Sequence, residues 1–318
     1  TVSVSNYLGA GINLSSGGEL VIESGTVDVT SLNAAAIGGI MYGKGGKVTI
    51  KGGTVTAIGG VGSAGIGGGF HGDGGTVIIE GGTVTAAGGP ESAGIGGGFH
   101  GDGGTVIIKG GTVTATGKGG AAGIGGGTGG KGAAVIIEGG NVIAAGGSQI
   151  AGIGGGSGCV DNGSLIISGG SVQMQYMLNT TAVIPRNKYN TVLYPVTLTL
   201  KWKDRAADKL LDDAGHIIKT AEGTYGYGTK DVKTDAKGNV YFWLPAGNGS
   251  VIYDIALLAD GRIYSNHAVA VSTAIGNEAI LQHETIEDQL RAQAAAGGEY
   301  KLTTDFNGEI GSEPILTE

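Results

Sequence analysis

The string Ala-Gly-Ile-Gly-Gly-Gly recurs every 29 residues, beginning at Ala64, Ala93, Ala122 and Ala151. A fixed period of this length is typical of a repeat fold, in which each unit buries its apolar face only by stacking on its neighbours. A degraded copy at Ala35, together with apolar segments that recur in step with the strings, indicates about six units within residues 10–172.

Each unit contains three short strand-like pieces, which in one copy are residues 76–80, 83–87 and 93–97, and glycines separate them. The chain has 70 Gly but only 5 Pro, and Gly does not recur at every third position, which excludes collagen. A disordered linker lacks the β-branched residues found between these glycines. Three strands per repeat predict a parallel β-helix, and the crossover rule predicts that it is right-handed.

Strand alternation assigns the side chains to two faces. Val77 and Ile79 are expected to point inward, and the residue between them outward. The outward position predicts an exterior row of Ile78, Ile107 and Ile136, extended by Val21, Thr49 and Ile166. The repeat also predicts one interior column, made of Ile66, Ile95, Ile124 and Ile153.

The repeat fades after Val172, and residues 173–190 are expected to form a cap. Period-2 segments then predict a small antiparallel β-sandwich, immunoglobulin-like or prealbumin-like, with strands at 196–201, 230–234, 239–244, 251–258 and 267–272. A helix is predicted over 278–296 and a strand over 299–305. The expected fold is therefore all-β: a right-handed parallel β-helix of about six coils (1–192), a β-sandwich spacer (193–273), and a truncated further module (274–318).

Charge and composition exclude several classes of protein. The net charge is −8, most of the acidic excess follows residue 192, and no basic stripe is present, so nucleic acid is not expected as a partner. No apolar run reaches the length of a membrane span in this segment. The single cysteine, Cys159, excludes an intramolecular disulfide. Because Thr1 is not a natural start, we expect a removed signal peptide or a start inside a longer protein.

The Ala-Gly-Ile-Gly-Gly-Gly and Gly-Gly-Thr-Val-Thr-Ala units resemble glycine-rich repeats of bacterial cell-surface proteins with right-handed β-helix domains, of adhesin-like or carbohydrate-binding type. The likeness covers about residues 10–172, and residues 226–231 and 241–245 are similar to spacer domains of such proteins. The stretch at 294–305 resembles the entry strand of another β-helix. The resemblance implies an extracellular, surface-located piece of a longer multidomain protein. It implies no cofactor and no catalytic residues.

His71 and Asp73 recur one period later as His100 and Asp102. Stacked coils would place each like pair about 5 Å apart, and two His with two Asp at that distance could hold a divalent metal. The alternative is a duplicated polar corner exposed to water. The next coil has Gly129 at the histidine position, so this row ends after two coils.

Two outward threonine rows are a further candidate binding surface, together with the isoleucine row. Their members are Thr54, Thr56, Thr83, Thr85, Thr112 and Thr114. Regular Thr-x-Thr arrays are similar to ice-binding surfaces. The simpler interpretation is that threonine is a good outward strand residue.

The second region contains the aromatic run Tyr241-Phe242-Trp243. Tyr241 and Trp243 are expected on one strand face and Phe242 with Leu244 on the other, and one face should be core. Exposed aromatic platforms bind sugars, but a core role is the favoured interpretation.

The function expected from these features is a non-catalytic cell-surface adhesin or structural stalk that binds a host or environmental glycan or a surface protein. A glycan-binding module of a carbohydrate-degrading assembly is the alternative. A polysaccharide lyase or glycoside hydrolase would need acids or bases clustered on one face, whereas the outward positions are mainly Thr, Ile and Gly. An enzyme is therefore not expected.

Overall fold

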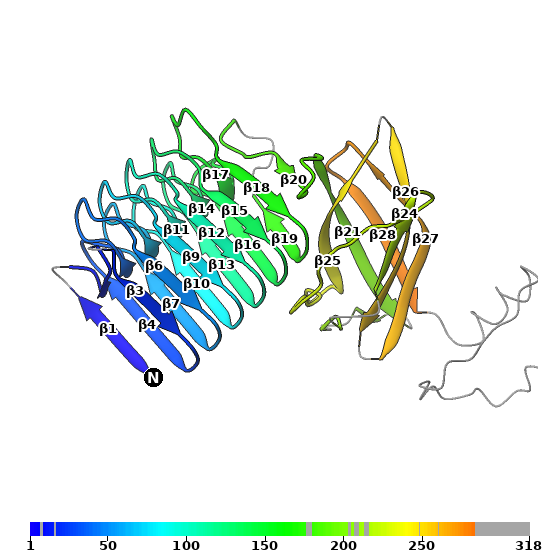
Figure 1. Ribbon diagram of the computed structural model, residues 1–318, viewed down its shortest axis with the longest axis horizontal. Coiled ribbons are helices and arrows are strands. Elements are labelled where there is room, and N and C mark those ends of the chain that lie inside the picture. Colours follow the sequence, from blue (N-terminus) through cyan, green and yellow to red (C-terminus); the bar gives the residue numbers. More distant parts are fainter. Residues whose placement is uncertain are drawn as a thin grey trace, which may run out of the picture.

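The structure is a computed structural model, and it describes residues 1–283 except 7–8, 16, 176–179, 203–204, 207–209, 213–215, 248 and 260. Every regular element within these residues is a β-strand. Figure 1 shows a parallel β-helix of about six coils followed by a curled sheet. The described residues form no helix that is long and apolar enough to cross a membrane.

The β-helix is built from three parallel sheets, one on each side of the coil. Sheet A contains β1 (Val2–Asn6), β4 (Thr26–Ser31), β7 (Thr54–Ile58), β10 (Thr83–Ala87), β13 (Thr112–Thr116), β16 (Asn141–Ala145) and β19 (Ser171–Met174). Sheet B contains β2 (Ile12–Asn13), β5 (Ile37–Gly38), β8 (Ile66–Gly67), β11 (Ile95–Gly96), β14 (Ile124–Gly125) and β17 (Ile153–Gly154). Sheet C contains β3 (Glu19–Ile22), β6 (Lys47–Ile50), β9 (Thr76–Ile79), β12 (Thr105–Ile108), β15 (Ala134–Ile137), β18 (Ser164–Ile167) and β20 (Pro185–Arg186).

The register of these sheets places each residue on its counterpart in the next coil. The predicted interior column is confirmed, because Ile66, Ile95, Ile124 and Ile153 pair in sequence across sheet B and all are buried. The predicted alternation in sheet C is also confirmed, since Val77 and Ile79 are buried. The apolar columns of the three sheets meet in one continuous core.

Sheet B explains the Gly-Gly-Gly part of the repeat. Gly67 has a φ of 138°, and a Cβ added there would lie 2.1 Å from the carbonyl oxygen of Gly96 in the next coil. Since real Cβ atoms do not approach oxygen so closely, only glycine permits this stacking distance.

The second region forms a single mixed sheet, which we call sheet D, and not two packed antiparallel sheets. Its strands are β21 (Leu193–Trp202), β22 (Arg205–Ala206), β23 (Ile217–Thr220), β24 (Gly223–Thr224), β25 (Asn239–Pro245), β26 (Ser250–Ala259), β27 (Arg262–Ser272) and β28 (Asn277–His283). β21 pairs with β28 in parallel and with β25 in antiparallel orientation. The sheet curls around its own apolar core, which includes Phe242, Tyr253 and Leu281.

The predicted helix over 278–296 is wrong for its described part, because Asn277–His283 is strand β28. Leu281 is fully buried while Ile280 is 42% exposed, so the alternation of a strand decides the faces here. The rest of that helix and the strand expected at 299–305 lie outside the described residues. Because β28 pairs with β21, the sheet of the second domain continues past the boundary expected at residue 273.

The strand expected at 230–234 is also wrong. Those residues do not pair with β25, whose partner is β21. Residues 230–233 belong instead to a segment that lies along the β-helix, residues 227–233, which we call the strap. A turn precedes β25, since Gly238 N donates to Asp235 O at 2.9 Å.

The C-terminal end of the β-helix core is closed by residues from two regions. Val183 and Leu193, on either side of β20, pack on the core, and the expected cap therefore holds for this part of 173–190. Trp243 of β25 also belongs to the β-helix core, is 3% exposed, and donates its indole Nε1–H to Val172 O at 3.0 Å. Phe242, its neighbour, lies in the core of sheet D, so both faces of β25 are buried in different cores.

Candidate functional site

The outward isoleucine row lies on sheet C as expected. The register joins Val21, Thr49, Ile78, Ile107, Ile136 and Ile166, and then Arg186. The three central isoleucines are half-buried. Beside the row, Lys51 pairs with Glu23 at 2.8 Å and Lys109 with Glu80 at 3.2 Å, so a charged ladder borders one side. Hydrogen bonding to Glu23 raises the pKa of Lys51.

The threonine rows lie on the outward face of sheet A. Thr83 pairs with Thr54 and Thr112, and Thr85 pairs with Thr56 and Thr114. Thr83 and Thr85 are exposed, whereas Thr112 and Thr114 are half-buried. Asp28 and Ile143 replace threonine at the two ends of the second row. The Thr-x-Thr array is therefore three coils long, with the first row continuing to Thr26, and it offers hydroxyls on the outward face of sheet A.

At the candidate metal corner, the Asp side chains make polar contacts, whereas the His side chains stack. Asp73 pairs with Lys44 at 3.1 Å and accepts a hydrogen bond from Asp102 N at 3.2 Å, and Asp102 accepts one from Lys131 N at 2.9 Å. These carboxylates thus connect successive coils. No group of three His, Cys, Asp or Glu side chains arranged for a metal occurs in the described part of the chain.

The two histidines stack on one another and on a tyrosine. The ring centroids of His71 and His100 are 5.3 Å apart with planes 8° from parallel, and Tyr42 stacks on His71 at 5.7 Å and 9°. Imidazole lone pairs lie in the ring plane, so parallel rings do not aim their nitrogens at a common point. We call Tyr42, His71 and His100 the aromatic column.

Two phenylalanines hold the column from the side. Phe70 meets His71 edge to face at 4.3 Å, and Phe99 lies 3.9 Å from His100. The loops that precede and follow the strands of sheet B meet beside these rings, since Phe99 N donates to Gly62 O at 2.9 Å. A Cβ on Gly62 would meet the Phe70 ring at 2.2 Å, so this glycine makes room for the ring.

Exposed aliphatic side chains continue this surface along the same loops. Leu32, Ile40, Met41 and Val61 are each exposed, and we call them the loop patch. Val61 N donates to Leu32 O, so these two stack in neighbouring coils. An apolar surface gathered in this way is typical of an interaction site, because isolated exposed residues are common but clustered ones are not.

The column ends where the sequence changes from aromatic to small residues. In the next coil Thr128 replaces phenylalanine, and its Oγ1 donates to Glu91 Oε2 at 2.5 Å. Gly120 N donates to the same carboxylate at 2.8 Å. These two hydrogen bonds, that of Thr128 first, lower the pKa of Glu91. The loops of this coil are thus joined by a polar bridge where the preceding coils use aromatic rings.

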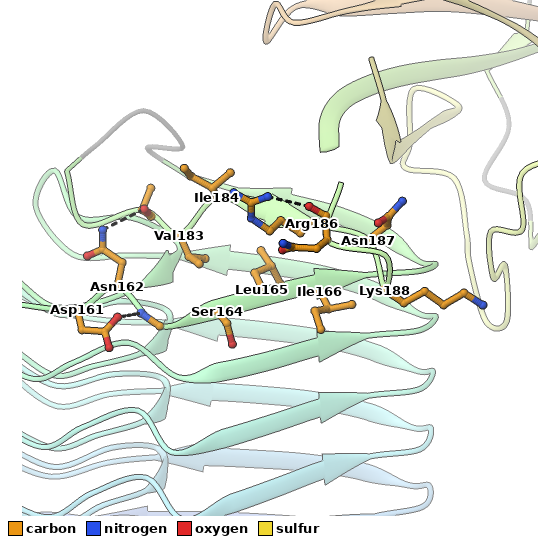
Figure 2. A pocket seen from close by; sticks show the side chains of 13 residues that line it. Asp161, Asn162, Ser164, Leu165, Ile166, Val183, Ile184, Arg186, Asn187 and Lys188 are labelled. Atoms are coloured by element: carbon orange, nitrogen blue, oxygen red, sulfur yellow. Dashed lines mark hydrogen bonds between the residues drawn. The ribbon is translucent and has the colours of Figure 1, made fainter. Parts of the chain in front are cut away.

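A separate cavity of about 440 Å³ lies at the C-terminal end of sheet C. Figure 2 shows Leu165, Ile166, Val183 and Ile184 beside Arg186 and Lys188. The Arg186 guanidinium donates to Asn190 O at 2.8 Å, and Asn162 Nδ2 donates to Thr180 O at 2.7 Å. Because these polar groups already hold the cap in place, the cavity is a weaker candidate than the aromatic column.

Comparison with known proteins agrees with the β-helix. The family described as Beta helix repeat matches residues 48–70, 77–99, 106–128 and 135–157, all of which lie in the parallel β-helix of the structure. No curated protein and no solved structure matches the chain.

Sequence reasoning found the histidines but missed the surface to which they belong. Phe70 and Phe99 recur at the same period as His71 and His100, and Tyr42 is one further period upstream. That shared period is the signal in the sequence from which this aromatic surface could have been found. It predicts that like residues stack in successive coils. The contacts between each phenylalanine and the histidine that follows it depend instead on side-chain direction at a left-handed corner.

Proposed function

We propose that this chain is a non-catalytic segment of an extracellular adhesin or stalk, in which a stiff β-helix is fixed to the domain that follows it. The observation that carries the proposal is the interface between the β-helix and sheet D. A flexible spacer would leave each domain with a core built only from its own residues. Here Trp243 of sheet D completes the core of the β-helix.

The strap strengthens this junction along the corner between sheets C and A. Gly170 N donates to Gly228 O at 2.8 Å, and one coil further back Gly140 N donates to Lys230 O at 2.7 Å. In the coil before that, Gly111 N donates to Asp231 Oδ2 at 2.8 Å. The strap therefore binds three successive coils and resists bending of the rod against sheet D.

The glycines of this corner also make space for the strap. A Cβ on Gly169 would lie 2.4 Å from Gly228 O, and one on Gly110 would lie 2.4 Å from Asp231 Oδ2. Side chains at these corners would push the strap away, which supports a junction built into the repeat.

The engagement of surface carboxylates supports a non-catalytic role. Glu23 and Glu80 pair with lysines, Asp73 and Asp102 accept backbone N–H groups, and Glu91 binds Thr128. Glycoside hydrolysis needs two carboxyls that exchange protons with the substrate and water. Carboxylates that join neighbouring coils in this way contribute to the fold.

To test the absence of catalysis, the full chain is incubated with soluble xylan, galactomannan, mixed-linkage β-glucan and hyaluronan. We expect no new reducing ends and no unsaturated products. In parallel, the chain is pulled from its two ends in a single-molecule force measurement, where we expect sheet D and the last coils to unfold together. Product release, or independent low-force extension at the junction, would refute the proposal.

A further inference from the structure

One corner position of the β-helix carries aromatic side chains in a backbone conformation that favours glycine. The residues at this position in successive coils are Tyr42, His71, His100, Gly129 and Gly158, with φ of 60°, 56°, 57°, 80° and 76°. All five are left-handed, but only the last two are glycine.

A side chain at such a position has a cost in stability, because Cβ crowds the following carbonyl oxygen. The two coils with glycine at this corner show that the fold forms without a side chain there. The burial of these side chains does not offset the cost, since Tyr42 is 70% exposed and both histidines are exposed. Strain kept at an exposed position points to a role at the surface.

The rings are also held rigidly. Each histidine contacts a half-buried phenylalanine, with centroids at 4.3 Å for His71 and 3.9 Å for His100. Phe70 and Phe99 in turn lie 5.7 Å apart and are tilted by 36°. Five rings over three coils therefore form one preorganised unit, which reduces the entropy lost when a ligand binds.

We propose that the aromatic column and the loop patch bind a neutral linear polysaccharide that lies along the axis of the β-helix. This inference rests on the proposed function, for which it supplies the adhesive surface and its ligand class. The ring centroids of the column are 5.3 and 5.7 Å apart, with one ring from each coil. A linear polysaccharide repeats once per sugar along its length, so successive sugars can follow the rings from coil to coil.

The chemistry of the surface suits sugars. Aromatic rings and the aliphatic loop patch can contact the C–H groups of a pyranose, and the Tyr42 hydroxyl and the imidazole nitrogens can exchange hydrogen bonds with its hydroxyls. Lys44 and Asp73 beside the column neutralise each other at 3.1 Å. Because this pair carries no net charge, it gives no preference for a charged ligand.

The experiment is affinity gel electrophoresis of the full chain in gels that contain xylan, galactomannan, mixed-linkage β-glucan or hyaluronan. The principal variant is Tyr42→Gly/His71→Gly/His100→Gly, which removes the rings and relieves the strained corners as Gly129 does naturally. A second variant, Tyr42→Asn/His71→Asn, keeps a polar side chain that tolerates φ above zero. The control is Tyr189→Ala, which removes a 77% exposed ring at the other end of the β-helix.

We expect at least one neutral polysaccharide to retard the wild-type chain and the control equally. Both ring-deletion variants should bind at least about tenfold more weakly, since one aromatic contact contributes about two- to tenfold and several are lost. The melting temperature of the triple glycine variant should not fall.

Four results would overturn the site: no retardation by any neutral polysaccharide, retardation by hyaluronan alone, equal retardation of the ring-deletion variants, or loss of binding in the Tyr189→Ala control. Capture on protein-coated beads without retardation in any gel would mark the surface as a protein interface and would also overturn it. None of these results affects the proposed stalk, which fails instead on product release or on independent unfolding at the junction.

Discussion

Trp243→Ala tests whether a side chain of sheet D completes the core of the β-helix. The indole is 3% exposed, packs on the β-helix core, and donates a hydrogen bond to Val172 O at 3.0 Å. Truncating a buried tryptophan to alanine costs about 3–5 kcal/mol, through lost transfer free energy and the cavity that remains. We expect this loss to fall on β16 and β19, although the substituted residue belongs to sheet D.

The assay is hydrogen exchange followed by mass spectrometry, read separately for peptides of β16 and β19 and for peptides of β26 and β27. The matched control is Phe242→Ala, because this adjacent residue is fully buried in the core of sheet D. Trp243→Ala should accelerate exchange first in the last coils, and Phe242→Ala first in sheet D. An intermediate variant, Trp243→Phe, retains part of the volume and should lose about 1–2 kcal/mol.

Equal acceleration of the same peptides by the two alanine variants would refute a β-helix core completed by Trp243. A change of less than about 1 kcal/mol in the stability of the last coils on Trp243→Ala would refute it too, since that would show a solvent-accessible or collapsible site.

Four further predictions follow from other contacts. Asp231→Ala removes the acceptor from a strap hydrogen bond and should destabilise the junction by about 1–2 kcal/mol, measured as faster local exchange; unchanged exchange would contradict the role of the strap. The pKa of Glu91 is lowered in the folded state, so the stability that its carboxylate contributes is fully present above the ordinary pKa of 4.5 and is lost as pH falls through the folded pKa. Glu91→Gln should therefore reduce the fall of the melting temperature with decreasing pH in the acid range. An unchanged fall would contradict this role of Glu91. Adding Ca²⁺, Zn²⁺ or Mn²⁺ should change the melting temperature little, and a shift of several degrees that disappears in His71→Ala/His100→Ala would reverse this conclusion. Ile107→Lys should lower the melting temperature or the mass in solution if the isoleucine row is covered by another chain segment or a second copy, whereas no change in either would show that the row faces water.

The repeat in the sequence determined most of the β-helix. Because the period is constant, each residue stacks on its counterpart, and the interior column of Ile66, Ile95, Ile124 and Ile153 could be predicted without coordinates. Alternation within strands then fixed which side chains point inward. These are local and translational properties, which a sequence expresses directly.

The candidate site was predictable only in part. The period placed His71 over His100 correctly, but it left open whether the corner binds a metal or is a polar corner exposed to water, because it gives the spacing of side chains and not the direction of their rings. The left-handed φ of these residues and the flanking phenylalanines produce parallel stacking, and neither follows from spacing.

The second region shows what only the tertiary structure decided. Alternation correctly placed Phe242 and Trp243 on opposite faces of β25, but it does not say what each face meets. The stretch at Asn277–His283 suggested a helix until its pairing with β21 and β27 selected the strand. In both places the deciding contacts join residues far apart in the chain, and the free energy of those contacts overrides local preference.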